Sequence, residues 1–105
     1  MKDITKQDIL NYLKEIKPYF KKKGISSLAL FGSYTKEDTT IYSDIDIAIK
    51  KDVTYLKYHQ AYEYFATINE LKNLLIHKFK KPVDVLDIDS QSPFISYIEK
   101  DIIYV

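Results

Sequence analysis

Two aspartates stand two residues apart, at Asp44 and Asp46, in a segment that alternates between polar and apolar side chains. From Asp44 to Lys50 isoleucine occupies every second position, which predicts a half-buried β-strand. Side chains two apart on a strand project from the same face, so both carboxylates lie opposite the isoleucines. Carboxylate oxygens are the ligands that Mg²⁺ prefers, together with substrate phosphates. By itself, such a pair is more often two solvated aspartates on a half-exposed strand, and a magnesium site is the alternative.

A glycine and a serine precede this pair. Gly32-Ser33 follows the apolar run from Ser27 to Phe31, which predicts a short buried strand. Glycine lets the backbone approach a ligand closely, and a helix opened by Ser33 would offer free N–H groups to an anion. A Gly-Ser pair alone is common in turns, but with both aspartates at this spacing it recurs by chance in only about one in a thousand chains of this length. The combination predicts a phosphate site beside the acidic pair.

A third carboxylate has the same phase. Residues 83–88 alternate as a strand whose valines face the core, so Asp84 faces the same way as the acidic pair. If this strand lies beside that of Asp46, the three carboxylates converge, and Asp84 could take the proton of an attacking hydroxyl. Asp87 has the opposite phase and Asp89 adjoins a predicted turn. Both are interpreted as strand-end or capping residues.

Helical patterns flank these strands. Thr5 resembles an N-cap, and the helix that follows should kink or stop near Pro18 and end before a left-handed Gly24. The stretch from Thr54 to about Phe79 contains neither glycine nor proline and predicts the longest helix. Its apolar stripe is spaced by three and four residues. The stripe consists of Ala61, Phe65, Ile68, Leu71, Leu75 and Phe79.

Near the end of the chain Ser92 precedes Pro93, a cap followed by a preferred first helical residue. A short helix is expected from there, with its isoleucines at positions 95, 98 and 102 facing inward. The fold class is therefore α/β (α+β). We expect a small mixed three-stranded sheet with helices packed on it, in a single domain over residues 1–105.

Composition excludes several classes of protein. The chain has 105 residues and is 46% apolar, which suits one small folded domain. A net charge of +1 argues against dedicated nucleic-acid binding. Without cysteine there are no thiolate metal sites, and the lone histidines His59 and His77 are interpreted as structural or surface residues. No apolar run approaches the roughly 20 residues that span a bilayer. A soluble cytoplasmic protein without membrane contact is expected.

These motifs resemble a known family. Gly32-Ser33, ten intervening residues and Asp44-Ile45-Asp46 resemble the signature of the DNA polymerase beta-like nucleotidyltransferase superfamily. Val83-Asp84-Val85 is similar to its third-carboxylate strand, and the pattern from Ile98 to Tyr104 is similar to the end of its short MNT members, the minimal nucleotidyltransferases. The resemblance covers nearly the whole chain.

The resemblance implies site residues and an activity. Gly32 and Ser33, with Lys36, would bind the nucleoside triphosphate, while Asp44, Asp46 and Asp84 would bind Mg²⁺, two ions in this family. MNT antitoxins are paired with a helical HEPN ribonuclease toxin and are thought to add AMP, taken from ATP, to a tyrosine of that toxin. The chain would then be an ATP-dependent protein adenylyltransferase that acts as an antitoxin.

The resemblance has one departure, and other functions stay open. Where many MNT chains carry Arg-Gly, this chain has Lys36 and Glu37. Lysine keeps the positive charge but loses the bidentate fork of arginine; both residues could also be ordinary solvated helix positions. The alternatives to protein adenylylation are an antitoxin that blocks its partner by contact alone and nucleotidyl transfer to a small molecule or an RNA.

Overall fold

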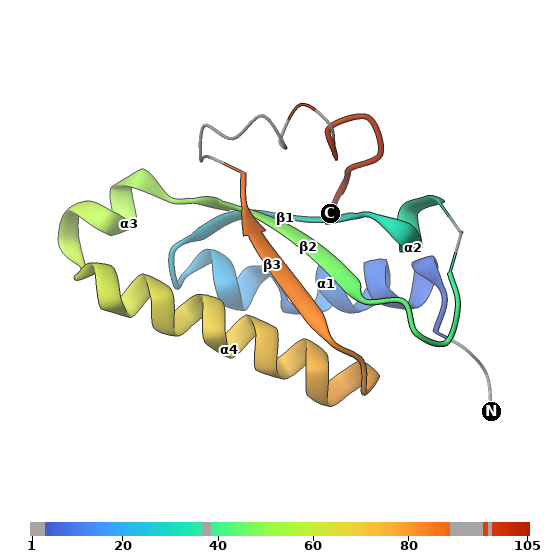
Figure 1. Cartoon of the computed structure of the whole chain (residues 1–105). Helices are drawn as coiled ribbons and strands as arrows, with labels where there is room; N and C mark the ends of the chain where they lie inside the picture. The colour runs from blue at the N-terminus through green and yellow to red at the C-terminus, as the bar shows by residue number, and fades with distance from the viewer. Residues whose placement is uncertain (1–3, 37–38, 89–95, 97) are drawn as a thin grey trace.

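A four-stranded sheet with helices on one face forms the body of the protein (Figure 1). The computed structural model describes residues 4–36, 39–88, 96 and 98–105. Figure 1 shows α1 and α4 beneath the sheet and the last described segment on its other side. None of the helices in these ranges is both long and apolar enough to cross a membrane. The elements in chain order are α1 (Lys6–Lys21), β1 (Ile25–Phe31), α2 (Ser33–Lys36), β2 (Ile45–Lys51), α3 (Val53–Tyr58), α4 (Ala61–Phe79), β3 (Val83–Asp87) and β4 (Ile103–Tyr104).

The first helix starts as the sequence predicts but continues past its proline. The Thr5 side chain accepts from the Asp8 N–H at 3.1 Å, and Asp8 accepts from the Thr5 N–H at 3.0 Å. Of the kink or stop expected near Pro18, the stop does not occur, because α1 runs on to Lys21 and ends before Gly24 as predicted. Phe20 lies beyond the proline and is fully buried, so apolar burial offsets the lost hydrogen bond. The left-handed Gly24 is confirmed, with φ of +101°.

The sheet is mixed, as predicted, but it has four strands instead of three, in the order β3-β2-β1-β4. Strand β1 pairs antiparallel with both β2 and β4, and β2 pairs parallel with β3. The fourth strand consists of only Ile103 and Tyr104, which is too short to show an alternating pattern in the sequence. Most of the short helix expected after Ser92 lies outside the described residues.

The long helix predicted from Thr54 to Phe79 is two helices. The chain leaves α3 at His59, and Gln60 begins α4 with a capping box closed by Glu63. The inward stripe is confirmed from Leu71 to Phe79 but is wrong at its start. Phe65 is 65% exposed, because its neighbour Tyr64 occupies the buried position.

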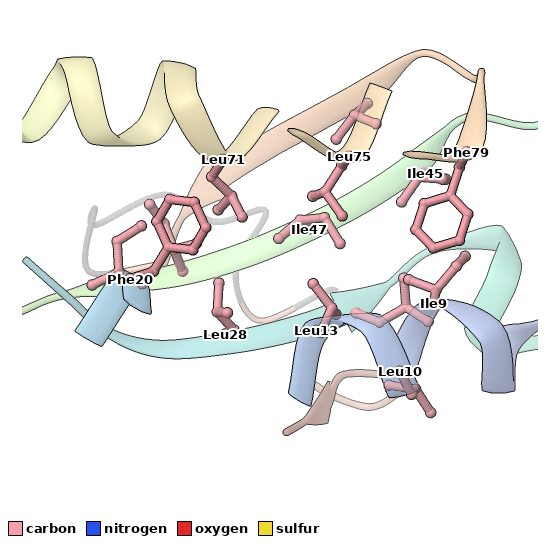
Figure 2. Close-up of a cluster of buried hydrophobic side chains, with 14 of the residues drawn as sticks. Ile9, Leu10, Leu13, Phe20, Leu28, Ile45, Ile47, Leu71, Leu75 and Phe79 are labelled. Carbon is pink, nitrogen blue, oxygen red and sulfur yellow. The ribbon is translucent and has the colours of Figure 1, made fainter. Parts of the chain in front are cut away.

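The two faces of the sheet have separate apolar clusters. Figure 2 shows Leu71, Leu75 and Phe79 of α4 pointing toward Ile45 and Ile47 of β2, across from side chains of α1. This is the main core. A smaller cluster on the other face joins the C-terminal segment to the sheet. Its buried members are Ala29, Phe31, Ala48 and Ile98.

Candidate active site

The strand alternation of β2 places Asp46 on the face away from the main core. Ile45 and Ile47 on either side of it are fully buried under α1 and α4. Successive side chains of a strand point to opposite faces, so the carboxylate of Asp46 projects to the side of the smaller cluster. Asp44 lies just before the strand and is exposed. The sequence prediction of this phase is confirmed.

The parallel pairing of β2 with β3 brings the third carboxylate to this place. Asp84 is the direct register partner of Asp46, and the flanking pairs are Ile45 with Val83 and Ile47 with Val85. A parallel pair needs a crossover connection, which α3 and α4 supply. Two carboxylates that are far apart in the chain therefore face the same side from adjacent strands.

Gly32 gives the Asp46 carboxylate its place. Phe31 at the end of β1 is the register partner of Asp46, and Gly32 follows it with φ of +80°. A Cβ added at Gly32 would overlap Oδ2 of Asp46 and lie 3.0 Å from its Cγ. Glycine is therefore required twice, by the left-handed backbone and by the close approach of the carboxylate.

The acidic groups influence one another electrostatically. Burial raises the pKa of the Asp46 carboxyl to about 6, and the negative charges of Asp84 and Asp44 add to the rise. Among the described residues, however, no three Asp, Glu, His or Cys side chains already stand close enough together to hold a metal ion. Repulsion between like charges opposes such a gathering without a cation. The carboxylate oxygens fit Mg²⁺ by chemistry, and the charge on Asp46 is costly without a cation.

The residues predicted to bind phosphate, Gly32 and Ser33, adjoin the acidic pair. Ser33 opens α2, a single turn of helix, as the sequence predicts. The Gly32 carbonyl accepts from the Thr35 N–H at 3.1 Å and from the Thr35 hydroxyl at 2.7 Å, and Tyr34 is buried beneath the turn. These contacts fix the Ser33 backbone at the end of β1, next to Asp46.

Lys36 has a partner that the sequence did not indicate. Its Nζ lies 3.6 Å from Oδ2 of Asp101, and both side chains are partly exposed. Strand β4 pairs with β1 through Leu30 and Ile103, which brings the preceding Asp101 toward the Gly32 end of β1. A contact between residues so distant in the chain leaves no local pattern. Glu37, next to Lys36, lies outside the described residues.

Asp87, the second acidic residue of β3, lies on the face opposite to Asp84. Asp87 accepts from the Tyr64 hydroxyl at 3.3 Å and lies 3.4 Å from Lys51 Nζ. Its predicted phase, opposite to that of Asp84, is confirmed. Asp89 lies outside the described residues. His59 stacks on Tyr55 with ring centroids 3.8 Å apart, in keeping with a structural role.

Comparison with known proteins agrees with this arrangement. The family described as Polymerase beta, Nucleotidyltransferase matches residues 14–104. Among relatives from Methanocaldococcus jannaschii, "Putative protein adenylyltransferase MJ1379" is 36% identical, over 96% of this chain and 98% of its own. "Putative protein adenylyltransferase MJ0126" is 32% identical, over 95% and 93% of the two chains.

Solved structures share the fold. Two crystal structures of mutants of the toxin–antitoxin MntA-HpeT align with TM-scores of 0.57 and 0.54. They are 20% and 22% identical to this chain, covering 96% and 98% of it and 71% and 72% of their own chains. With a left-handed glycine beside two facing aspartates and a family match over most of its length, the chain belongs to the polymerase beta nucleotidyltransferase family. The family resemblance in the sequence is confirmed.

Proposed function

We propose that this nucleotidyltransferase moves AMP from ATP to a tyrosine hydroxyl of a partner protein. The observation that carries the proposal is the pair of carboxylates Asp46 and Asp84 on adjacent strands, with Asp46 packed against Gly32. The relatives that match nearly the whole chain, which bear the name of protein adenylyltransferases, support a protein as the acceptor.

The transfer is a single displacement at the α-phosphorus of ATP. The tyrosine oxygen bonds to that phosphorus while the bond to the oxygen bridging to the β-phosphate breaks. Pyrophosphate leaves with the electron pair of the broken bond, and the phenol proton passes to the Asp84 carboxylate. Asp84 suits this task because its side chain is exposed and faces the same side as Asp46.

Each remaining site residue has a binding task. Gly32 and Ser33 receive the triphosphate through backbone N–H groups and the serine hydroxyl, and Lys36 adds a positive charge. Asp44, Asp46 and Asp84 would hold Mg²⁺, with two ions in the site. When bound, the metal neutralises charge on the phosphates and on the carboxylates. Asp46 would then be ionised despite its burial.

The partner we propose is a helical HEPN toxin that this chain silences in the cytoplasm. The described residues form one sheet with its covering helices, and an acceptor carried by a separate protein suits this arrangement. Solved toxin–antitoxin proteins with the same fold support such a pairing.

The proposal is tested with labelled ATP, Mg²⁺ and the product of the neighbouring gene. We expect label on a tyrosine of that product, and a loss of about 100-fold or more in transfer rate for Asp84→Asn. Asp87→Asn is the matched control, because Asp87 lies on the same strand but on the opposite face. It should keep transfer within about threefold, because the contacts of Asp87 with Tyr64 and Lys51 lie on the face away from Asp46 and Asp84. Equal losses in both variants would refute the assignment.

The same reagents decide between the alternatives. If the Asp44→Asn and Asp46→Asn double variant still silences the partner, the chain is an antitoxin that acts by contact. If label appears on an RNA or on a small hydroxylated molecule without the partner, the chemistry stands but the acceptor is different.

A further inference from the structure

The turn that precedes Asp44 is fixed by its own hydrogen bonds. The Thr40 N–H donates to the Ser43 hydroxyl at 2.8 Å, and the Ser43 N–H donates back to the Thr40 carbonyl at 3.1 Å. The Tyr42 N–H donates to the Thr40 hydroxyl at 3.1 Å. The backbone from residue 40 to residue 43 therefore has one defined shape.

A lysine attaches this turn to the start of β3. Lys81 Nζ donates to the Ile41 carbonyl at 3.1 Å, and the Ile45 N–H donates to the Pro82 carbonyl at 3.0 Å. The turn is therefore tied to the segment that leads directly into Asp84. Because β2 and β3 are parallel, both acidic strands begin at the edge where this turn lies.

The turn displays two large apolar side chains. Ile41 is 67% exposed and Tyr42 is 85% exposed. Their exposure does not result from a loose backbone, and neither contributes to the apolar clusters of the fold. Other exposed aromatic side chains are Tyr58, the last residue of α3, and Tyr62, in the first turn of α4. Figure 1 shows α3 at the opposite end of the molecule from α2.

The side from which an acceptor can reach the acidic site indicates what binds to Ile41 and Tyr42. One face of the sheet is covered by α1 and α4, and on the other the C-terminal segment packs over Phe31 and Ala48. The edge beside the turn is where Asp44 and Asp84 remain exposed. A projecting apolar turn suits a protein surface better than a small molecule, which is bound in a concave site.

We infer that Ile41 and Tyr42 form the contact surface for the acceptor protein, next to the acidic edge. The inference rests on the proposed function and names where its partner docks. Three carboxylates and a triphosphate carry more negative charge than two Mg²⁺ ions can neutralise, so the loaded site still repels an acidic surface. The occupant is therefore a folded protein that presents an apolar patch with neutral or basic surroundings beside its acceptor hydroxyl.

The test compares two double variants of the whole chain. Ile41→Ser with Tyr42→Ser removes the proposed surface, whereas Val53→Ser with Tyr58→Ser removes side chains that are 69% and 80% exposed on α3. We measure the Kd for the neighbouring gene's product and, separately, the Kd for ATP. The first variant should weaken partner binding at least about 30-fold, the size of a hot-spot loss. The Kd of this variant for ATP should stay within about twofold of the wild-type value, and so should the Kd of the α3 variant for the partner. Neither quantity depends on the proposed contact.

A conservative variant separates the ring from its hydroxyl. Tyr42→Phe keeps the apolar surface and should restore partner binding to the wild-type value. Unchanged partner binding in the Ile41→Ser, Tyr42→Ser variant overturns the inference, as does an equal loss in the α3 variant or a parallel loss of ATP affinity. No complex between the wild-type chain and this product also overturns it. If partner binding depends on Ile41 and Tyr42 but no AMP is transferred, the proposed function fails and the contact surface stands.

Discussion

The two faces of the sheet differ in role, although the same strands form both: one face carries the main core and the other carries the acidic site. On one face of β2, Ile45, Ile47 and Ile49 are fully buried beneath α1 and α4. On the other, Asp46 is only half-buried, and its pKa is raised by burial and by neighbouring carboxylates. Stability is therefore concentrated on the helix-covered face, and the acidic site lies at one end of the opposite face.

This division implies that the site can be altered at little cost to folding. Strand alternation gives each face its own set of side chains, so removal of a carboxylate leaves the helix-covered core intact. The comparison makes three predictions, in which the expected change in the free energy of unfolding decreases from the first to the last.

The largest effect is expected in the main core. Ile47→Ala removes a fully buried side chain that Figure 2 shows between α1 and α4. It should lower the free energy of unfolding by about 3 kcal/mol, through lost apolar transfer and the cavity left behind. Urea denaturation measures the change. Asp84→Asn on the other face is the control and should shift it by less than ~1 kcal/mol. Similar losses in both variants would contradict the division between the faces.

The second prediction concerns Gly32, which follows β1 and lies against the Asp46 carboxylate. Gly32→Ala places a Cβ at a φ of +80° and against the Asp46 carboxylate. It should cost about 1–2 kcal/mol of stability through the left-handed backbone and should also weaken ATP binding. Gly24→Ala has φ of +101° and a Cβ that meets Tyr55, so it should cost stability without changing ATP affinity. Calorimetry with ATP and thermal melts separate the two effects.

The smallest effect is a pH dependence in metal-free protein. The pKa of Asp46 rises from 3.8 to about 6 on folding, chiefly through burial, so the folded state binds this proton more tightly. Stability contributed by the protonated group is present below about pH 4 and is lost as pH rises through about 6. Asp46→Asn abolishes this loss and should melt about 4 °C above wild type at pH 7, for about 1 kcal/mol after discounting solvent screening. The difference in Tm should vanish near pH 3.5. A constant difference across this range would show that Asp46 does not titrate there.

Much of the site was predictable from local pattern. The alternation around Ile47 fixes the phase of Asp46, and the same period fixes that of Asp84. The phase determines on which face of the sheet a side chain lies, and the structure confirms the predicted phase of both Asp46 and Asp84. Their direct pairing depends on strand register, which the sequence does not show. The Lys36–Asp101 contact has the same character, because only the pairing of β4 with β1 brings these residues together.

The errors in the fold come from ambiguous or very short signals. Tyr64 and Phe65 are adjacent aromatic residues, and either could continue the stripe that ends at Phe79. The buried one is Tyr64, whose hydroxyl reaches Asp87 from the edge of the core. The break before α4 uses Gln60 as its cap, a residue that is a weaker signal than serine or aspartate.

The direct pairing of Asp46 with Asp84 on parallel strands limits where insertions and deletions can be tolerated during evolution. Insertions or deletions in the crossover helices leave the spacing between the two carboxylates untouched, because strand pairing alone sets it. Loss of a single residue at the start of β3 would instead turn Asp84 under α4. We therefore expect length variation among relatives to accumulate between β2 and β3 and to spare the five residues of β3.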